Sequence, residues 1–281
     1  MAKVKQKDLL DAGVHFGHMT SKWDPRMAPY IFMEKNGVHI IDLNQTKRSL
    51  ESAGEAAKNI VKSGRKIMFV ATKKQAKEVV VDEAKKLNMP YVTERWLGGM
   101  MTNFATVRKS LKKLSSIDKL MKGDEFNALA KRERLMRTRD KEKLQRVLGG
   151  IQDMTRLPAA LFVVDAKREH IAIAEAKKLN IPVFAIVDTN TNPNSVDFPI
   201  PGNDDAFKSI EILTKAFSAS IEEGLAERKK DKDNAKQKEM EAEKKAVDAS
   251  KEENTAKEEK AVDSAKKEVV VETETATEEK K

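Results

Sequence analysis

Residues 158–189 read PAALFVVDAKREHIAIAEAKKLNIPVFAIVDT, and this stretch decides the fold class of the chain. Two continuous apolar runs, ALFVVDA at 160–166 and PVFAIVDT at 182–189, flank a helical pattern over residues 168–179. Apolar runs that are continuous rather than alternating are typical of parallel strands covered on both faces. Two such strands joined by one helix predict parallel pairing through a right-handed crossover.

The same alternation extends on both sides of this stretch. Further strands are predicted from the apolar runs VHIIDL at 38–43, KIMFVA at 66–71 and YVTE at 91–94. Helical patterns cover residues 45–62, 73–87 and 204–224. We therefore expect an α/β fold, namely a doubly wound sheet of about five parallel strands.

The alternation breaks between Asn103 and Leu148, where apolar residues recur at helical spacing. They form a first stripe and, beyond Gly123, a second one: Phe104, Val107, Leu111, Leu114, Ile117 and Met121, then Phe126, Leu129, Met136, Leu144 and Val147. Stripes this narrow predict an antiparallel coiled-coil hairpin of two helices, inserted into the α/β domain. Its 14 Lys/Arg and 6 Asp/Glu give a charge of 14 − 6 = +8. A solvated helix pair with surplus lysines is one interpretation, and a surface that meets a polyanion is the one we favour.

Charge and composition divide the chain into parts. Residues 226–281 hold 15 Lys/Arg, 17 Asp/Glu and no aromatic residue, so we expect a disordered or loosely helical tail. Since the whole chain carries +9, residues 1–225 carry +9 − (−2) = +11, which indicates a polyanionic partner. The predicted organisation is a discontinuous α/β domain (1–102 and 149–225), an inserted basic hairpin (103–148) and the charged tail (226–281).

Several classes of protein are disfavoured by what the sequence lacks. It contains no cysteine, no run of about 18 apolar residues and no signal-peptide pattern, so we expect a soluble cytoplasmic protein. Neither G-x-G-x-x-G, G-x-x-x-x-G-K-[ST] nor G-x-S-x-G occurs. The glycine pair in RWLGGMMTN could place a phosphate on free amide groups, but a sharp exit from the sheet into the hairpin is the interpretation we favour.

Acidic residues follow two of the predicted strands, at the edge where such sheets bind ligands. Asp165 and Asp188, with Asp197, Asp204 and Asp205, could hold a hard cation through oxygen ligands. Helix capping explains the same residues more simply, and we predict no metal and no other cofactor.

The segment GVHFGHMTSKWDPR at 13–26 poses a similar choice. His15 and His18 could begin a zinc site, but His39 and His170 are distant in sequence, and Gly13, Gly17 and Pro25 indicate a bent loop. In the alternative, Phe16 and Trp23 pin this loop to the body while His18, Lys22 and Arg26 meet phosphates. We favour this second interpretation, an anchor for RNA.

Several motifs together resemble a known family. LLDAGVHFGHMTSKWDPRMAPYIF, NGVHIIDLNQT, FVATKKQA, RWLGGMMTNF, the stretch quoted first and IPGNDDAFKSI follow one another over about residues 5–225, in the order of the bacterial small-subunit ribosomal protein two family. The resemblance implies a flavodoxin-like sheet with a coiled-coil hairpin and no catalytic activity. It also implies a place between the head and body of the small subunit, contacts with 16S ribosomal RNA and neighbouring ribosomal proteins, and help in recruiting ribosomal protein one.

Motif position and charge together give the candidate RNA-binding residues: His18, Lys22, Trp23, Arg26, Arg95, Trp96, Asn103, Arg108 and Lys109. The rival hypothesis is a nucleotide- or metal-dependent enzyme on the same sheet. It requires a phosphate cradle or an acidic cluster that converges in space.

Overall fold

The computed structural model describes residues 5–123, 125–231 and 233. By internal contacts the chain divides into a compact unit, Met1–Arg228, and a second unit, Lys229–Lys281. Most of the second unit lies outside the described residues, and with it nearly all of the predicted tail. Residues 226–231 are helical.

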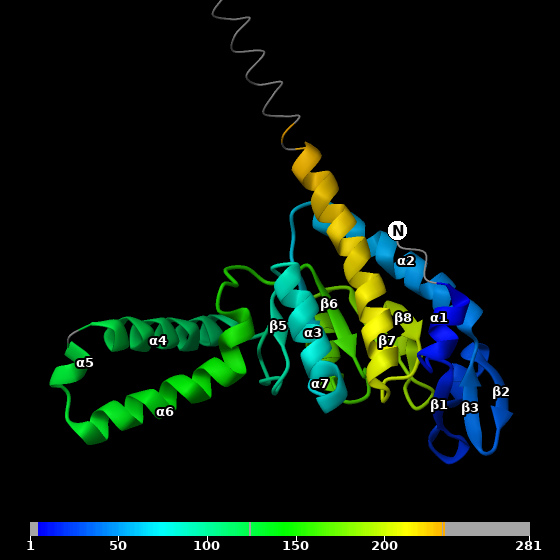
Figure 1. Cartoon of the computed structure of the whole chain (residues 1–281), viewed down its shortest axis with the longest axis horizontal. Helices are drawn as coiled ribbons and strands as arrows, with labels where there is room; N and C mark the ends of the chain where they lie inside the picture. The colour runs from blue at the N-terminus through cyan, green and yellow to red at the C-terminus, as the bar shows by residue number, and fades with distance from the viewer. Residues whose placement is uncertain (1–4, 124, 232, 234–281) are drawn as a thin grey trace, which may run out of the picture. The chain divides into compact units, whose positions relative to one another are not determined.

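The core of the compact unit is a five-stranded sheet with the order β5-β4-β6-β7-β8, all neighbours parallel. Its strands are β4 (Ile67–Val70), β5 (Tyr91–Val92), β6 (Ala160–Val164), β7 (Val183–Val187) and β8 (Phe198–Pro201). The helices between them are α3 (Lys74–Lys86) and α7 (His170–Lys178), and α2 (Leu43–Lys62) precedes β4. This confirms the predicted α/β fold, in which the stretch 158–189 forms β6, α7 and β7 (Figure 1).

Alternate residues of the strands face two separate hydrophobic cores. Phe69, Phe162 and Phe184 face α2, α3 and the helix that begins at residue 207, where Phe217 stacks on Phe162 with ring centroids 4.4 Å apart. Met68, Val163 and their neighbours face α7 and the first turns of the inserted hairpin. Both faces of the sheet are thus covered, which explains the continuous apolar runs.

One strand assignment from the sequence was wrong, and one strand of the parallel sheet was not predicted. The run VHIIDL does not join the parallel sheet, because β3 (Val38–Ile41) pairs antiparallel with β1 (Phe16–Met19) and β2 (Ile31–Lys35) in a separate sheet. Asn36 and Gly37, with φ of 53° and 73°, form the tight turn between β2 and β3. The fifth parallel strand is instead β8, whose Pro199 and Pro201 are tolerated because β8 lies at the sheet edge.

Segment 13–26 is also more regular than the predicted bent loop. Residues 16–19 form β1, and two 3₁₀ helices follow, η1 (Thr20–Lys22) and η2 (Pro25–Tyr30). Short 3₁₀ helices also occur after the hairpin, η3 (Gly149–Ile151), and before β8, η4 (Pro193–Ser195). The chain begins with α1 (Gln6–Asp11), whose Leu9 is buried in the core.

The inserted hairpin consists of α4 (Phe104–Lys122), the short α5 (Glu125–Ala128) and α6 (Lys131–Leu148), which lies antiparallel to α4 (Figure 1). The first predicted stripe is confirmed, because Val107, Leu111, Leu114 and Ile117 are buried. The second is only partly correct, since Met136 is 59% exposed and the half-buried positions of the outer part of α6 are Arg134, Thr138 and Lys141. Polar side chains therefore line the contact between α4 and the outer part of α6.

Candidate functional site

The opening stretch brings His18 into the body of the protein rather than leaving it free. The Nδ1 atom of His18 lies 3.0 Å from Asp188 Oδ2, and Nε2 lies 3.5 Å from Asp205 Oδ2. Its backbone N–H donates a hydrogen bond to Thr189 Oγ1 (2.9 Å), which ties β1 to the end of β7. The hydrogen bond to Asp188 raises the pKa of His18. His18 was therefore wrongly predicted as a free phosphate contact, because its partners lie about 170 residues away.

The same partners belong to a cluster at the carboxyl edge of the sheet, which we call the carboxyl-edge cluster: His18, Lys73, Asp165, Asp188, Asp204 and Asp205. The Lys73 ammonium lies 2.8 Å from Asp204 Oδ1, 2.6 Å from Asp205 Oδ1 and 3.7 Å from Asp165 Oδ2. Burial, together with the nearby carboxylates of Asp188 and Asp165, raises the pKa of Asp204 to about 7. The sequence analysis did not select Lys73, although it lies three residues after the end of β4, in FVATKKQA.

This cluster partly meets the geometric requirement of a cation site. One ligand atom each from His18, Asp188 and Asp204 lies within 4.8 Å of the others, and Asp204 Oδ2 is buried without a hydrogen-bond partner. His15 is not part of any such group among the described residues, and Asp197 instead accepts a hydrogen bond from the Val183 N–H (2.9 Å). His15 therefore contributes no ligand atom to the group around His18. Lys73 already supplies a positive charge among the carboxylates.

The loop with the glycine pair holds a carboxylate of the protein itself. Both oxygens of Glu175, on α7, accept hydrogen bonds from this loop. The donors are the Trp96 indole (3.0 Å), the amide groups of Gly99 (2.8 Å), Met101 (2.9 Å) and Thr102 (3.1 Å), and the Thr102 hydroxyl (3.2 Å). Burial alone would raise the pKa of Glu175, but the hydrogen bonds from Trp96 and the loop amides lower it. The amide groups that could have held a phosphate are thus occupied, and the structural interpretation of the loop holds.

Trp96 is consequently not available to RNA. Its side chain is buried in the core that also contains Met100 and Val107, and its indole N–H is used by Glu175. The sequence places Trp96 beside Arg95, but it does not reveal that Glu175 on α7 is the partner of Trp96. We therefore correct this candidate to a structural residue.

The remaining candidates lie on the surface in two groups. Lys22, Trp23 and Arg26 lie on or beside the two 3₁₀ helices after β1, where Trp23 is 37% exposed and its ring centroid is 5.0 Å from that of His39. Arg95, Asn103, Arg108 and Lys109 are exposed at the start of the hairpin. Met27 of η2 and Val107 of α4 are buried in the same core, so both groups border the same face of the sheet.

The hairpin carries most of the net positive charge of residues 1–225, +8 of +11. Of its 14 cations, three form ion pairs with its carboxylates: Lys113 with Asp140 (3.8 Å), Lys141 with Asp118 (2.7 Å) and Arg137 with Glu133 (3.5 Å). The other 14 − 3 = 11 have no carboxylate partner among the described residues. A surface of this kind attracts phosphates.

Comparison with known proteins matches residues 9–224 to the family described as Ribosomal protein S2. This chain belongs to the ribosomal protein S2 family. The small ribosomal subunit protein uS2 of Cytophaga hutchinsonii is 70% identical over 239 residues, which cover 85% of this chain and 94% of that protein. The uS2 proteins of Flavobacterium johnsoniae (62% identical; 82% and 91% covered) and Parabacteroides distasonis (56%; 85% and 86%) are also similar.

Family membership resolves the choice between the rival classes. A ribosomal protein S2 is a small-subunit protein of translation and not an enzyme, so the nucleotide- or metal-dependent enzyme hypothesis is abandoned. Within the described residues, no helix combines the length and apolar character that a membrane crossing needs.

Proposed function

We propose that this chain is a structural component of the small (30S) ribosomal subunit of the cytoplasm, where it binds 16S ribosomal RNA between head and body. The observation that carries the proposal is the set of 11 hairpin cations without a carboxylate partner among the described residues, on a member of the ribosomal protein S2 family. Cations left unpaired by the protein are available to neutralise phosphates, and each release of counterions favours binding. The RNA contacts are then the hairpin and the exposed candidates Lys22, Trp23, Arg26, Arg95, Asn103, Arg108 and Lys109.

The proposal also assigns roles to the parts of the chain. The discontinuous α/β domain of residues 1–102 and 149–225 holds both groups of candidates against one core, and the hairpin of residues 103–148 extends the basic surface.

A protein partner is included in the proposal, because one face of the small sheet is apolar and exposed. The register β1-β3-β2 aligns Phe16 with Ile40 and Met33, and Met19 with Val38, so these side chains share a face. Phe16, Met19 and Met33 are each about half exposed. An exposed apolar surface of this kind is typical of a protein-binding site, and we propose that it helps recruit ribosomal protein one.

The RNA part is tested by adding variants to small subunits from which the protein has been removed. Arg108→Ala/Lys109→Ala should bind at least tenfold more weakly than wild type, since each charged hydrogen bond contributes roughly 1.5–3 kcal/mol. Lys208→Ala is the matched control, because Lys208 is exposed beside Asp8, Asp11 and Glu211. Equal binding by wild type and the double variant, measured by quantitative mass spectrometry of sedimented subunits, would argue against the RNA role of the hairpin.

The partner role is tested separately on the small sheet. Phe16→Ser/Met33→Ser should reduce the ribosomal protein one that sediments with small subunits, while the variant itself still binds them. Phe207→Ser removes an exposed phenylalanine outside this sheet and serves as the control. Unchanged recovery of ribosomal protein one would refute this part alone.

A further inference from the structure

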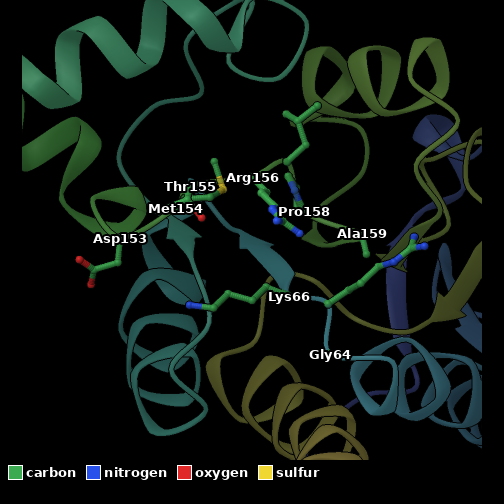
Figure 2. A pocket seen from close by; sticks show the side chains of 10 residues that line it. Gly64, Lys66, Asp153, Met154, Thr155, Arg156, Pro158 and Ala159 are labelled. Carbon is green, nitrogen blue, oxygen red and sulfur yellow. The ribbon is translucent and has the colours of Figure 1, made fainter.

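A basic pocket lies at the edge of the sheet opposite to the carboxyl-edge cluster. Gly64, Arg65 and Lys66, before β4, and residues 153–159, before β6, line a cavity of about 460 Å³ (Figure 2). Because parallel strands start at one edge and end at the other, this pocket is separated from the cluster by the length of the strands. None of the RNA candidates from the sequence lines it.

Positive charge dominates the pocket. Arg65, Lys66 and Arg156 are exposed, and none of them forms an ion pair or side-chain hydrogen bond within the described residues. Asp153 is the one acidic lining residue, and Figure 2 shows it at the margin with its carboxylate directed away from Arg156. The lining therefore carries 3 − 1 = +2, and its cations are not neutralised by the fold.

Backbone donors add to this charge. The successive N–H groups of Thr155, Arg156 and Leu157 donate no hydrogen bond to any described part of the protein. Several adjacent amide groups without acceptors are a common element of anion sites. Together with the planar guanidinium of Arg156, they provide the donors that a phosphate oxygen requires.

The pocket is held in place by buried neighbours. The Ala159 N–H donates to the Lys66 carbonyl (2.9 Å), the Met154 N–H donates to the Ile151 carbonyl (3.0 Å), and Met154 and Pro158 are buried. The backbone that carries the cations is thus already ordered, which reduces the entropy lost on binding.

We propose that this pocket binds a phosphate of the small-subunit ribosomal RNA backbone, as a second contact remote from the candidates above; the inference rests on the proposed function. The lining residues include no aromatic side chain on which a base could stack, so the pocket recognises phosphate rather than nucleotide sequence. A backbone phosphate can reach this pocket, because its three cations are exposed and its amide donors have no acceptor among the described residues.

The test compares two double variants of the full chain for binding to a 16S ribosomal RNA transcript and to small subunits lacking the protein, over a range of salt. Arg65→Gln/Arg156→Gln should bind at least tenfold more weakly and lower the slope of log affinity against log salt by about 1 for each lost phosphate contact. Lys85→Gln/Lys208→Gln removes the same charge from exposed positions elsewhere and should leave the slope nearly unchanged. Arg156→Lys should keep most of the slope, because it retains the charge. Melting temperatures confirm that each variant folds.

A photo-crosslinking amino acid at position 157, whose side chain is exposed, identifies the neighbour directly. Crosslinks to 16S ribosomal RNA support the proposal, whereas crosslinks to ribosomal proteins alone overturn it. An unchanged slope for Arg65→Gln/Arg156→Gln also overturns it. If Arg108→Ala/Lys109→Ala weakens binding while the pocket variant does not, only this inference fails; if the wild type binds no RNA, the proposed function fails with it.

Discussion

Glu175 determines which anion the glycine-containing loop holds. The loop RWLGGMMTN contains the glycines and free amide groups that an anion site needs, and the anion in this protein is a carboxylate on α7. Five donors from one loop fix the point at which the chain leaves the sheet for the hairpin. Because the lowered pKa of Glu175 keeps it charged, this joint between α7 and the loop persists at neutral pH.

The first prediction concerns this joint. Glu175→Ala leaves buried donors without an acceptor and should lower the free energy of unfolding at pH 7 by about 3 kcal/mol or more, and Glu175→Gln should lower it less. A lowered folded-state pKa stabilises the fold above the unfolded value near 4.5, and this stabilisation is lost as the pH falls through the folded pKa. The difference between wild type and Glu175→Gln should therefore be large at pH 7 and decrease below pH 4. Denaturant titrations at both pH values measure it, and a difference independent of pH would contradict the assignment.

At the same scale, residue types could be read from the sequence, but the exposure of their side chains could not. Lys22, Arg26, Arg95, Arg108 and Lys109 were chosen for charge, and all are exposed. His18 and Trp96 were chosen by the same motifs, yet their side chains are used inside the protein. Asp188, the partner of His18, is 170 residues away along the chain, and Glu175, the partner of Trp96, is 79 residues away. Such distant partners cannot be identified from a local pattern.

At the scale of elements, the apolar pattern located strands but did not assign them to sheets. The run at 38–43 was assigned to the parallel sheet and the strand at 198–201 was not predicted, because the strength of an apolar pattern does not determine which sheet a strand joins. The Asn36–Gly37 turn pairs VHIIDL with its immediate neighbour, while the proline-containing FPIP needs only one strand partner and can form an edge. The Asn36–Gly37 pair was the sequence signal that could have revealed the β2–β3 hairpin.

The second prediction concerns the return of the hairpin to the sheet. A Cβ atom at Gly150 would lie 2.1 Å from the Tyr91 carbonyl oxygen and 2.7 Å from its Cδ2, so Gly150→Ala should destabilise the protein by at least about 1–3 kcal/mol. Gly149→Ala is the adjacent control, since its Cβ would meet nothing closer than 3.6 Å and its φ of −58° suits alanine. Thermal unfolding of both variants distinguishes them. Equal melting temperatures would show that β5 and η3 separate at little cost.

At the scale of the whole molecule, charge is distributed unevenly between the two edges of the parallel sheet and the inserted hairpin. At the carboxyl edge of the sheet, Lys73 and His18 form ion pairs with the four carboxylates of the carboxyl-edge cluster. The hairpin and the basic pocket at the opposite edge instead retain cations without a carboxylate partner among the described residues. The net charge of +11 on residues 1–225 does not reveal this uneven distribution. A polyanion is therefore attracted to particular surfaces, and not to the edge where α/β enzymes usually bind ligands.

The third prediction concerns where the compact unit ends. Half-buried Leu225 packs on the core, and Glu227 lies 2.5 Å from the Lys58 ammonium, so these residues belong to the unit that extends to Arg228. A chain ending at Arg228 should keep the melting temperature of the full chain. A chain ending at Gly224 should melt a few degrees lower, because losing about 1 kcal/mol shifts a domain of this size by about 2–4 °C. Calorimetry on the full chain and the two truncated chains measures these melting temperatures. Equal melting temperatures for both truncations would place the end of the unit before Leu225.

The sequence by itself determined the α/β class, the inserted basic hairpin and the family. Each of these depends on patterns within a short segment: continuous apolar runs, one apolar residue per helical turn, and motifs in a fixed order. Only the tertiary structure decided that VHIIDL belongs to another sheet, that Glu175 fills the glycine loop, and that Arg65 and Arg156 share a pocket. The physical reason is that burial, pairing and neutralisation depend on which distant residue folding brings within a few ångströms, and a local pattern carries no information about that residue.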